Sequence, residues 1–304
     1  VMKALYAFFQ SDNSDVRAGE KELFRSIDKV YEIYLYYLSF ACSLKDFVEN
    51  FIEERKLKHL PTEEDLNPKL NFVQNAVIRK FEESEELQNL LNQYQISWTG
   101  QDEIFRKVYF SFRNDREYRR YLNIENPEIE EDKNILHYLF DEFIMKSEQI
   151  GQLFEERSIY WLDDIGIMQE GVLKTIRSCK ADSPVKILPL LKEPEEERKF
   201  ASDLFRKTIL HNQAYETEIS RKTQNWEVER VAKMDMILMK MAICELTEFT
   251  QIPVKVTLDE YIELSKWYSS PQSKTFINGI LDKIVLEYKQ DNKIKKSGRG
   301  LQET

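Results

Sequence analysis

Hydrophobic side chains recur every three to four residues along most of this chain, which is the spacing that places them on one face of an α-helix. Residues 1–10 carry such a stripe, and the polar stretch 11–15 follows it as a loop. The pattern resumes over 19–56, which is long for one helix. We therefore expect either one long helical arm or two helices with a break near Ser43.

Prolines divide the rest of the chain. Pro61 and Pro68 bracket a polar connection, Asn126-Pro127 marks another break, and three prolines within 180–194 mark the clearest linker. Between these breaks the apolar spacing predicts helices over 69–95, 101–122, 131–154, 159–179, 195–221, 227–248, 256–268 and 272–289.

Composition supports an all-α protein. The chain has 304 residues but only 8 glycines and 8 prolines, which is too few for the many turns of a β-sandwich. Hydrophobic residues make up 42%, which excludes wholesale disorder and collagen-like structure. The length predicts about two domains.

The cysteines predict a reduced setting. Cys42, Cys179 and Cys244 lie far apart, and an odd number cannot pair fully within one chain. We expect a cytoplasmic protein in which they are small core residues. No apolar run approaches the ~20 residues of a membrane span, so no membrane association is expected. The chain opens at Val1 directly in a helical pattern, and we expect residues upstream of it.

Acidic charge is concentrated in the middle of the sequence. The net charge is −10, which taken alone argues against a general nucleic-acid binder. Residues 57–196 hold 18 basic and 28 acidic side chains, whereas residues 197–290 hold 14 of each. A local basic face outside the middle therefore remains compatible with the total.

No motif indicates an enzyme, a cofactor or a metal site. The histidines His59, His137 and His211 are scattered, and no glycine-rich phosphate loop or nucleophile motif is present. One segment, 105–124, mixes basic and aromatic residues in a way that suits RNA phosphates and bases. The alternative, which we favour, is a helix with buried aromatics whose arginines pair with Asp115 and Glu117.

The last third of the chain carries the most specific pattern. Thr257 fits the N-cap of a capping box. Pro271 suits the first turn of the last helix. Gly279 stands inside that helix, where glycine costs ~1 kcal/mol against alanine, so we expect another backbone or a ligand to approach it closely.

The residues of this region, and the order in which they occur, resemble those of the transcription antitermination factor NusB family. The features that carry the resemblance are Trp226, Glu229-Arg230, Asp235, Ile237-Leu238, residues 242–246, residues 252–256, Asp259-Glu260, residues 263–266 and residues 274–282, with support from residues 203–206 and 4–6. The resemblance implies an all-helical fold of two small bundles.

The resemblance also implies a non-enzymatic function. Family members bind boxA, a short single-stranded RNA element in ribosomal RNA leaders, together with NusE, a small-subunit ribosomal protein. With NusA and NusG they form an antitermination complex on RNA polymerase.

Two departures from the family pattern stand out. The arginine-rich stretch that precedes the first helix in the family is absent here. A large segment, about 20–195, separates the first helix from the C-terminal block. We therefore predict a first helix within 1–18, an acidic helical insertion at 19–190, a NusB-like core at 191–290 and a flexible basic tail at 291–304.

Functional residues can be carried over only where the positions match. The resemblance assigns RNA contacts to Lys3, Tyr6, Lys240, Gln272, Lys274 and Phe276, and partner contacts to Asp235 (with NusE) and Asn278. For each residue the alternative is a plain surface or capping role.

Two other functions stay open from the sequence. One is an RNA-binding subunit that serves an RNA methyltransferase or another ribosome-assembly enzyme. The other is a scaffold whose acidic insertion is a protein-interaction surface that mimics or masks RNA.

Overall fold

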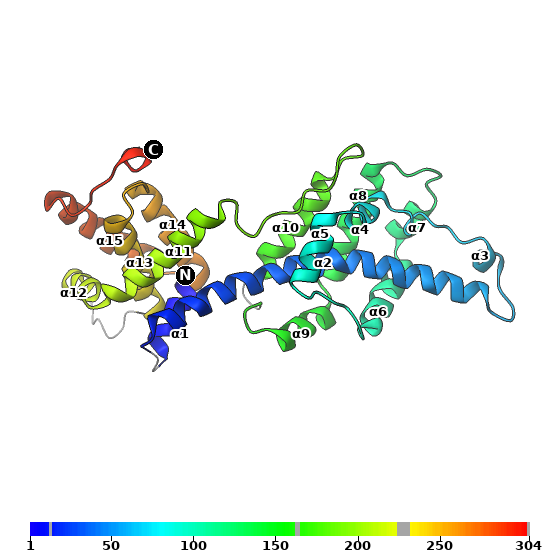
Figure 1. Cartoon of the computed structure of the whole chain (residues 1–304), viewed down its shortest axis with the longest axis horizontal. Coiled ribbons are helices and arrows are strands. Elements are labelled where there is room, and N and C mark those ends of the chain that lie inside the picture. Colours follow the sequence, from blue (N-terminus) through cyan, green and yellow to red (C-terminus); the bar gives the residue numbers. More distant parts are fainter. Residues whose placement is uncertain (12–13, 162–164, 224–231, 303–304) are drawn as a thin grey trace. The chain divides into compact units, whose positions relative to one another are not determined.

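The computed structural model describes residues 1–11, 14–161, 165–223 and 232–302. These residues form helices and connecting segments without any β-strand, which confirms the prediction of an all-α protein. The chain divides into two compact units (Figure 1). Unit 1 comprises Val1–Arg25 and Leu191–Thr304, and unit 2 comprises Ser26–Leu190. Across the described residues, no helix is both long and apolar enough to span a bilayer.

The helices follow the predicted order, with several additional breaks. Unit 1 contains α1 (Met2–Gln10), the start of α2 (Val16–Lys56), α11 (Pro194–Leu210), α12 (Asn212–Lys222), α13 (Lys233–Glu248), α14 (Val254–Tyr268), α15 (Ser273–Gln290) and a 3₁₀ turn, η3 (Gly298–Leu301). Unit 2 contains the rest of α2, α3 (Glu63–Leu66), α4 (Ala76–Glu82), α5 (Glu85–Gln93), α6 (Asp102–Arg113), α7 (Arg116–Leu122), α8 (Ile129–Leu139), a π-helical turn, η1 (Phe140–Ile144), α9 (Glu148–Arg157) and α10 (Ile165–Ser178).

Helix α2 is continuous through Ser43, so the long arm and not the broken pair is correct. The helix predicted over 195–221 is divided at His211 into α11 and α12. The predicted helix 227–248 begins at Lys233 in the described part of the chain, because residues 224–231 lie outside it.

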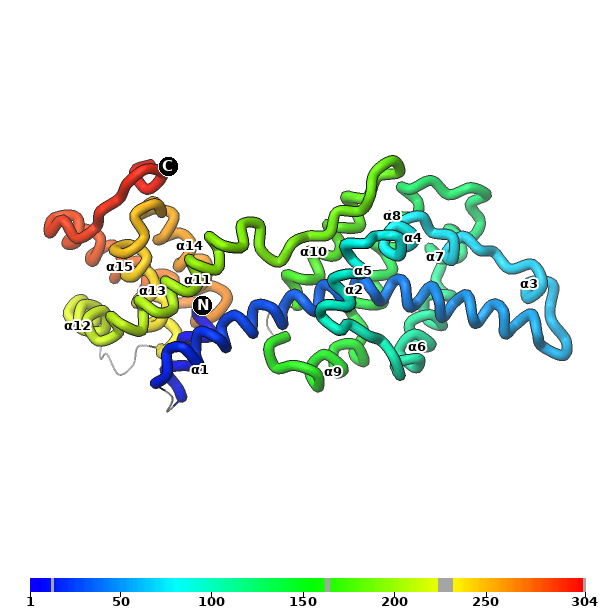
Figure 2. Tube along the Cα trace, in the orientation of Figure 1, coloured from blue at the N-terminus to red at the C-terminus, as the bar shows by residue number. Residues whose placement is uncertain are grey.

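Helix α13 is the core of unit 1. Every residue from Ile237 to Leu246 is buried, and the helix contacts α1, α11, α12, α14 and α15 (Figure 2). A helix that is surrounded in this way needs apolar side chains all round, which its run of leucine, isoleucine and methionine supplies. Its polar residues must then find partners inside the unit.

A glycine allows the start of α2 to pack closely in unit 1. A Cβ at Gly19 would lie 2.9 Å from ring atoms of both Phe8 on α1 and Phe205 on α11. Glu20, the next residue, accepts hydrogen bonds from Ser202 and Arg206 of α11. These hydrogen bonds, together with the charge of Arg206, outweigh the effect of burial and lower the pKa of Glu20.

The segment after α15 packs against the α13–α14 connection within unit 1. The Lys296 ammonium donates to the carbonyl of Phe249 at 2.9 Å, and the backbone amide of Ser297 donates to the carbonyl of Thr250 at 2.9 Å. A Cβ at Gly300 would lie 2.0 Å from the Thr250 carbonyl oxygen, so only glycine fits there. Lys296 therefore caps the end of α13, because its ammonium donates to the carbonyls of Glu245 and Phe249.

Aromatic side chains fill the core of unit 2. Phe40, which is fully buried on α2, packs with its ring centroid 5.0 Å from that of Trp98 and 4.9 Å from that of Phe105. The linker that follows α10 is tied to α2, because Tyr31 donates to the carbonyl of Leu188 at 2.7 Å and the amide of Leu188 donates to the Tyr34 hydroxyl at 3.0 Å.

The cysteines are core residues, as predicted. Cys179 and Cys244 are buried, and Cys42 is partly buried. Burial raises the pKa of both Cys179 and Cys244 to about 11 and that of Cys42 to about 12. The thiols therefore stay protonated at neutral pH and are poor nucleophiles.

We predict that Phe40→Ala lowers the free energy of unfolding of unit 2 by about 3–5 kcal/mol, because it removes a fully buried ring and leaves a cavity. Urea unfolding of the full chain followed by circular dichroism measures the change. Leu57→Ala is the control, since Leu57 on the same unit is 85% exposed and its loss is expected to change the free energy by less than about 0.5 kcal/mol. Equal effects of both substitutions would contradict the assigned core.

Candidate nucleic-acid interface

Helix α1 presents two of the sequence-predicted residues outward. Met2 and Leu5 are buried on the side where α1 packs against α13. Lys3 is half-buried and Tyr6 is 39% exposed. The ammonium of Lys3 lies 5.3 Å from the ring centroid of Tyr268, the last residue of α14. This cation–π contact brings the predicted face of α1 to the turn between α14 and α15.

A buried carboxylate holds that turn in place. Asp235, which is 5% exposed, accepts hydrogen bonds from the hydroxyls of Ser269 and of Ser273, the latter at 2.7 Å. Ser270 and Ser273 are joined at 2.8 Å. The family resemblance assigns Asp235 to partner contact, but its carboxylate is directed inward, where it positions the turn.

The turn carries the next group of predicted residues. Gln272 and Lys274 are exposed, and Phe276 is half-buried at the start of α15. Residues 269–275 contain one lysine and no carboxylate. A phosphate that approaches the turn therefore meets no negative side chain within it, which favours anion binding.

Trp267 is a further candidate residue, which neither the resemblance nor a motif indicated. Its side chain is 81% exposed on α14, next to Tyr268 in sequence. The buried residues of this helix are Thr257, Tyr261 and Ser265, which are four residues apart and define its inner face. Trp267 lies off that face, so helical spacing could have identified it. An exposed tryptophan is a suitable platform for stacking a base.

Lys240 is placed differently from the expectation of RNA contact. Its side chain is 7% exposed, and its ammonium donates to Asn212 at 2.7 Å and to Glu216 at 2.6 Å. It also lies 5.5 Å from the ring centroid of Phe9. Because these groups satisfy the ammonium inside unit 1, Lys240 ties α13 to α12 and α1 and is not presented to solvent.

Glu245 is the third buried polar residue of α13. Its carboxylate accepts from the hydroxyls of Thr257 at 2.8 Å and Tyr261 at 3.1 Å, and burial raises its pKa. The predicted capping role of Thr257 is wrong, because α14 begins at Val254 and the Thr257 hydroxyl is committed to Glu245.

Asn278 and Gly279 make no contact beyond their own helix among the interactions described. Asn278 is half-buried, and its amide donates to Asp282 one turn further along α15 at 3.1 Å. A Cβ at the exposed Gly279 would meet no described atom within 4 Å, so no backbone in the described part of the chain approaches it as expected. Trp226, Glu229 and Arg230 lie outside the described residues.

Charge is divided unequally between the two units. Unit 1 contains 23 basic and 23 acidic residues, whereas unit 2 contains 21 and 31, so unit 2 accounts for the net charge of −10. The cations of the candidate face therefore belong to a unit that is neutral as a whole. Among the described residues, no group of histidine, cysteine and carboxylate side chains could hold a metal ion.

Comparisons with known proteins converge on one family. The profile of the NusB family matches residues 174–286. A transcription antitermination protein NusB of Salinibacter ruber is 37% identical over 140 residues, which cover 44% of this chain and 88% of that protein. Proteins of the same name from Chloroherpeton thalassium and Geobacter sulfurreducens are 39% and 41% identical over 102 and 88 residues, which cover 34% and 29% of this chain and 48% and 64% of those proteins. No solved structure matches the chain.

The buried carboxyl of Glu245 predicts a pH dependence of stability. Because its pKa is raised in the folded state, the folded chain holds the proton more tightly than the unfolded chain, and stability falls as pH rises from about 4.5 through the folded-state pKa. Glu245→Gln removes this loss, which is at most about 1.4 kcal/mol per pH unit. The melting temperature of the variant relative to the native chain should therefore rise between pH 4 and pH 7.

Asp259→Asn is the matched control, since Asp259 is an exposed carboxylate on α14, the helix that carries both hydroxyl partners of Glu245. Its melting temperature should follow the native chain at each pH. A constant difference between Glu245→Gln and the native chain across the range would show that folding does not shift the pKa of Glu245, and would contradict the prediction.

Proposed function

Because the chain belongs to the NusB family, we propose that it acts in transcription antitermination by binding boxA-type single-stranded RNA together with NusE, within the antitermination complex on RNA polymerase. The family consists of RNA-binding transcription factors, and the prediction of a non-enzymatic protein is confirmed. We further propose that residues 19–190 are a helical insertion in the family core.

One observation supports an RNA-binding face most directly: the contact of Lys3 with Tyr268 brings α1 to the turn between α14 and α15. We define the α1–α14 face as Lys3, Tyr6, Trp267, Gln272, Lys274 and Phe276. It joins residues from opposite ends of the chain, as a binding surface built by folding would. The face combines two lysines with three aromatic side chains.

These residue types suit a single RNA strand. Lys3 and Lys274 can neutralise phosphates, and the exposed rings of Tyr6 and Trp267 can stack on unpaired bases. The amide of Gln272 can donate to and accept from a base edge. The serine turn that carries Gln272 is fixed by Asp235, so the face is organised before RNA binds.

The NusE contact is proposed for the region around Asn278. The carboxylate of Asp235 is committed to the serine turn, so its influence on a partner is indirect. Asn278 retains part of its surface on α15 and makes only a local hydrogen bond to Asp282 among the interactions described. Lys240 is not included in the RNA face, because its ammonium is satisfied within unit 1.

The proposed function is tested by fluorescence-anisotropy titration of a boxA-like RNA 12-mer and a scrambled 12-mer, with and without NusE, at two salt concentrations. We expect the boxA-like RNA to bind more tightly than the scrambled RNA, and NusE to increase this preference. The salt dependence should have a slope of about 0.7 for each phosphate neutralised. Equal affinity for both RNAs in the presence of NusE would contradict the proposal.

Trp267→Ala is predicted to weaken binding of the boxA-like 12-mer by about 5- to 150-fold, since stacking of one base is worth ~1–3 kcal/mol. Trp267→Phe should retain most of the affinity because it keeps an aromatic ring. Leu286→Ala is the control, as Leu286 is also exposed (64%) on unit 1 but lies on α15 outside the face. Unchanged affinity of Trp267→Ala would remove Trp267 from the site.

A further inference from the structure

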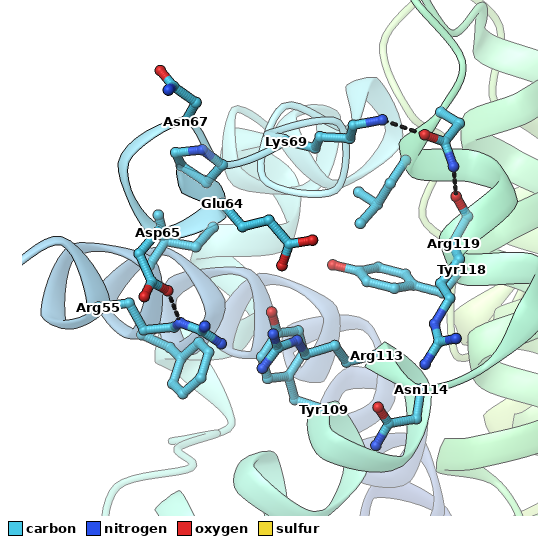
Figure 3. Close-up of a pocket in the computed structure, with 15 residues that line it drawn as sticks. Arg55, Glu64, Asp65, Asn67, Lys69, Tyr109, Arg113, Asn114, Tyr118 and Arg119 are labelled. Carbon is cyan, nitrogen blue, oxygen red and sulfur yellow. Dashed lines mark hydrogen bonds and ion pairs between the residues drawn. The ribbon is translucent and has the colours of Figure 1, made fainter. Parts of the chain in front are cut away.

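Unit 2 contains a pocket that the proposed function does not use (Figure 3). It encloses about 540 Å³ between the end of α2, the α3 segment, the end of α6 and helix α7. This volume is suitable for a small organic ligand, since such sites typically span ~300–1,000 Å³. All of its lining residues belong to unit 2.

The pocket has an excess of positive charge. Arg55, Lys69, Arg113 and Arg119 line it, against Glu64 and Asp65. Arg55 is neutralised locally, because it forms an ion pair with the buried Asp65. The remaining lining residues therefore place three cations opposite one carboxylate.

Two of these cations have no carboxylate partner. Arg113 packs over the ring of Phe51 at 5.7 Å, and neither Arg113 nor Arg119 forms an ion pair with any residue that the structure describes. In contrast, Arg120 on the same helix α7 pairs with Glu117 at 3.2 Å. Unpaired guanidinium groups in a pocket are suited to bidentate recognition of a phosphate.

This arrangement differs in part from the favoured interpretation of segment 105–124. Its aromatic side chains are largely buried, as expected. The expected pairing of its arginines is seen for Arg120, but Asp115 instead caps α7 by accepting from the amide of Glu117 at 2.7 Å and from the Tyr138 hydroxyl at 3.2 Å. Asp115 is thus committed elsewhere, which leaves Arg113 and Arg119 to the pocket.

A carboxylate and a tyrosine hydroxyl also line the pocket. Figure 3 shows the carboxylate of Glu64 directed into the pocket, toward the hydroxyl of Tyr118. Glu64 forms no ion pair within the described part of the chain and is exposed, so it can accept hydrogen bonds from a ligand. Burial raises the pKa of Tyr118 well above its ordinary value, so its hydroxyl keeps its proton, which it shares with Tyr109, and its oxygen can accept a hydrogen bond from a ligand.

The pocket is better suited to a small anion than to RNA. Unit 2 carries a net charge of −10, which repels a polyanion at long range. The rings of Tyr109 and Tyr118 are only 4% and 3% exposed, so bases cannot stack on them. A ligand with a single phosphate is repelled much less by the unit and can still bind Arg113 and Arg119.

We propose that this pocket binds a small phosphate monoester that carries hydroxyl groups, of about the size of a nucleoside monophosphate. Its phosphate lies between Arg113 and Arg119, and its hydroxyls donate to Glu64. The proposal is independent of RNA binding by unit 1.

Isothermal titration calorimetry of the full chain with adenosine 5′-monophosphate (AMP), ribose 5-phosphate and adenosine tests this site. Both phosphorylated compounds should bind at one site per chain, and adenosine should not bind. Tighter binding of AMP would add a base contact, whereas equal binding would assign recognition to the sugar phosphate. Absence of saturable binding by either phosphorylated compound would overturn the proposal.

Substitutions locate the site and keep the test independent of folding. Arg119→Gln, at an exposed residue, and Arg113→Gln should each weaken binding about tenfold or more, because each removes a charge-assisted hydrogen bond. Arg120→Gln is the matched control on α7 and should bind as the native chain does. Equal binding by the native chain and Arg119→Gln, or a tenfold loss of boxA-like RNA affinity in Arg119→Gln, would overturn the assignment to a small ligand.

Discussion

The structure of unit 1 depends on the burial of helix α13. A helix that is enclosed by five others gains its stability from apolar packing, and any polar side chain on it must be satisfied internally. Asp235, Lys240 and Glu245 meet this requirement at regular intervals of five residues, and each binds a different neighbour. Asp235 holds the turn before α15, Lys240 binds α12, and Glu245 binds α14. These contacts position α12, α14 and the turn before α15, which belongs to the α1–α14 face.

Charge separates the two kinds of binding that we propose. Unit 1 is neutral overall, so a few lysines and exposed aromatic rings can attract an RNA strand without opposition from the rest of the unit. Unit 2 is strongly acidic, so its cationic pocket acts only over short distances. Basic residues near aromatic side chains therefore suit RNA binding in unit 1 and binding of a small anion in unit 2. Exposure also separates them, since Trp267 offers a free ring face and Tyr118 offers only a hydroxyl.

The sequence predicted the elements well and the direction of individual side chains less well. Apolar spacing identified most helices, because burial requires a periodic pattern, but it left open whether residues 19–56 form one helix or two, and only the structure shows that α2 is continuous. It could not show that the serines at 269 and 273 and the pair Asn212 and Glu216 would satisfy Asp235 and Lys240, because those partners are distant along the chain. The docked segment 296–301 was missed for the same reason, since its hydrogen bonds go to residues before α14. Trp267 could have been found from the four-residue spacing of the buried positions on α14.

The central claim is that unit 1 recognises RNA through the α1–α14 face. Hydrogen–deuterium exchange of the full chain, with and without the boxA-like 12-mer and NusE, tests it most directly. RNA should slow exchange of backbone amides in residues 2–6 of α1 and in residues 266–276, beyond any protection that NusE alone produces, and should leave the amides of unit 2 unchanged. Protection by RNA that is confined to unit 2, or that spares both segments of unit 1, would contradict the account.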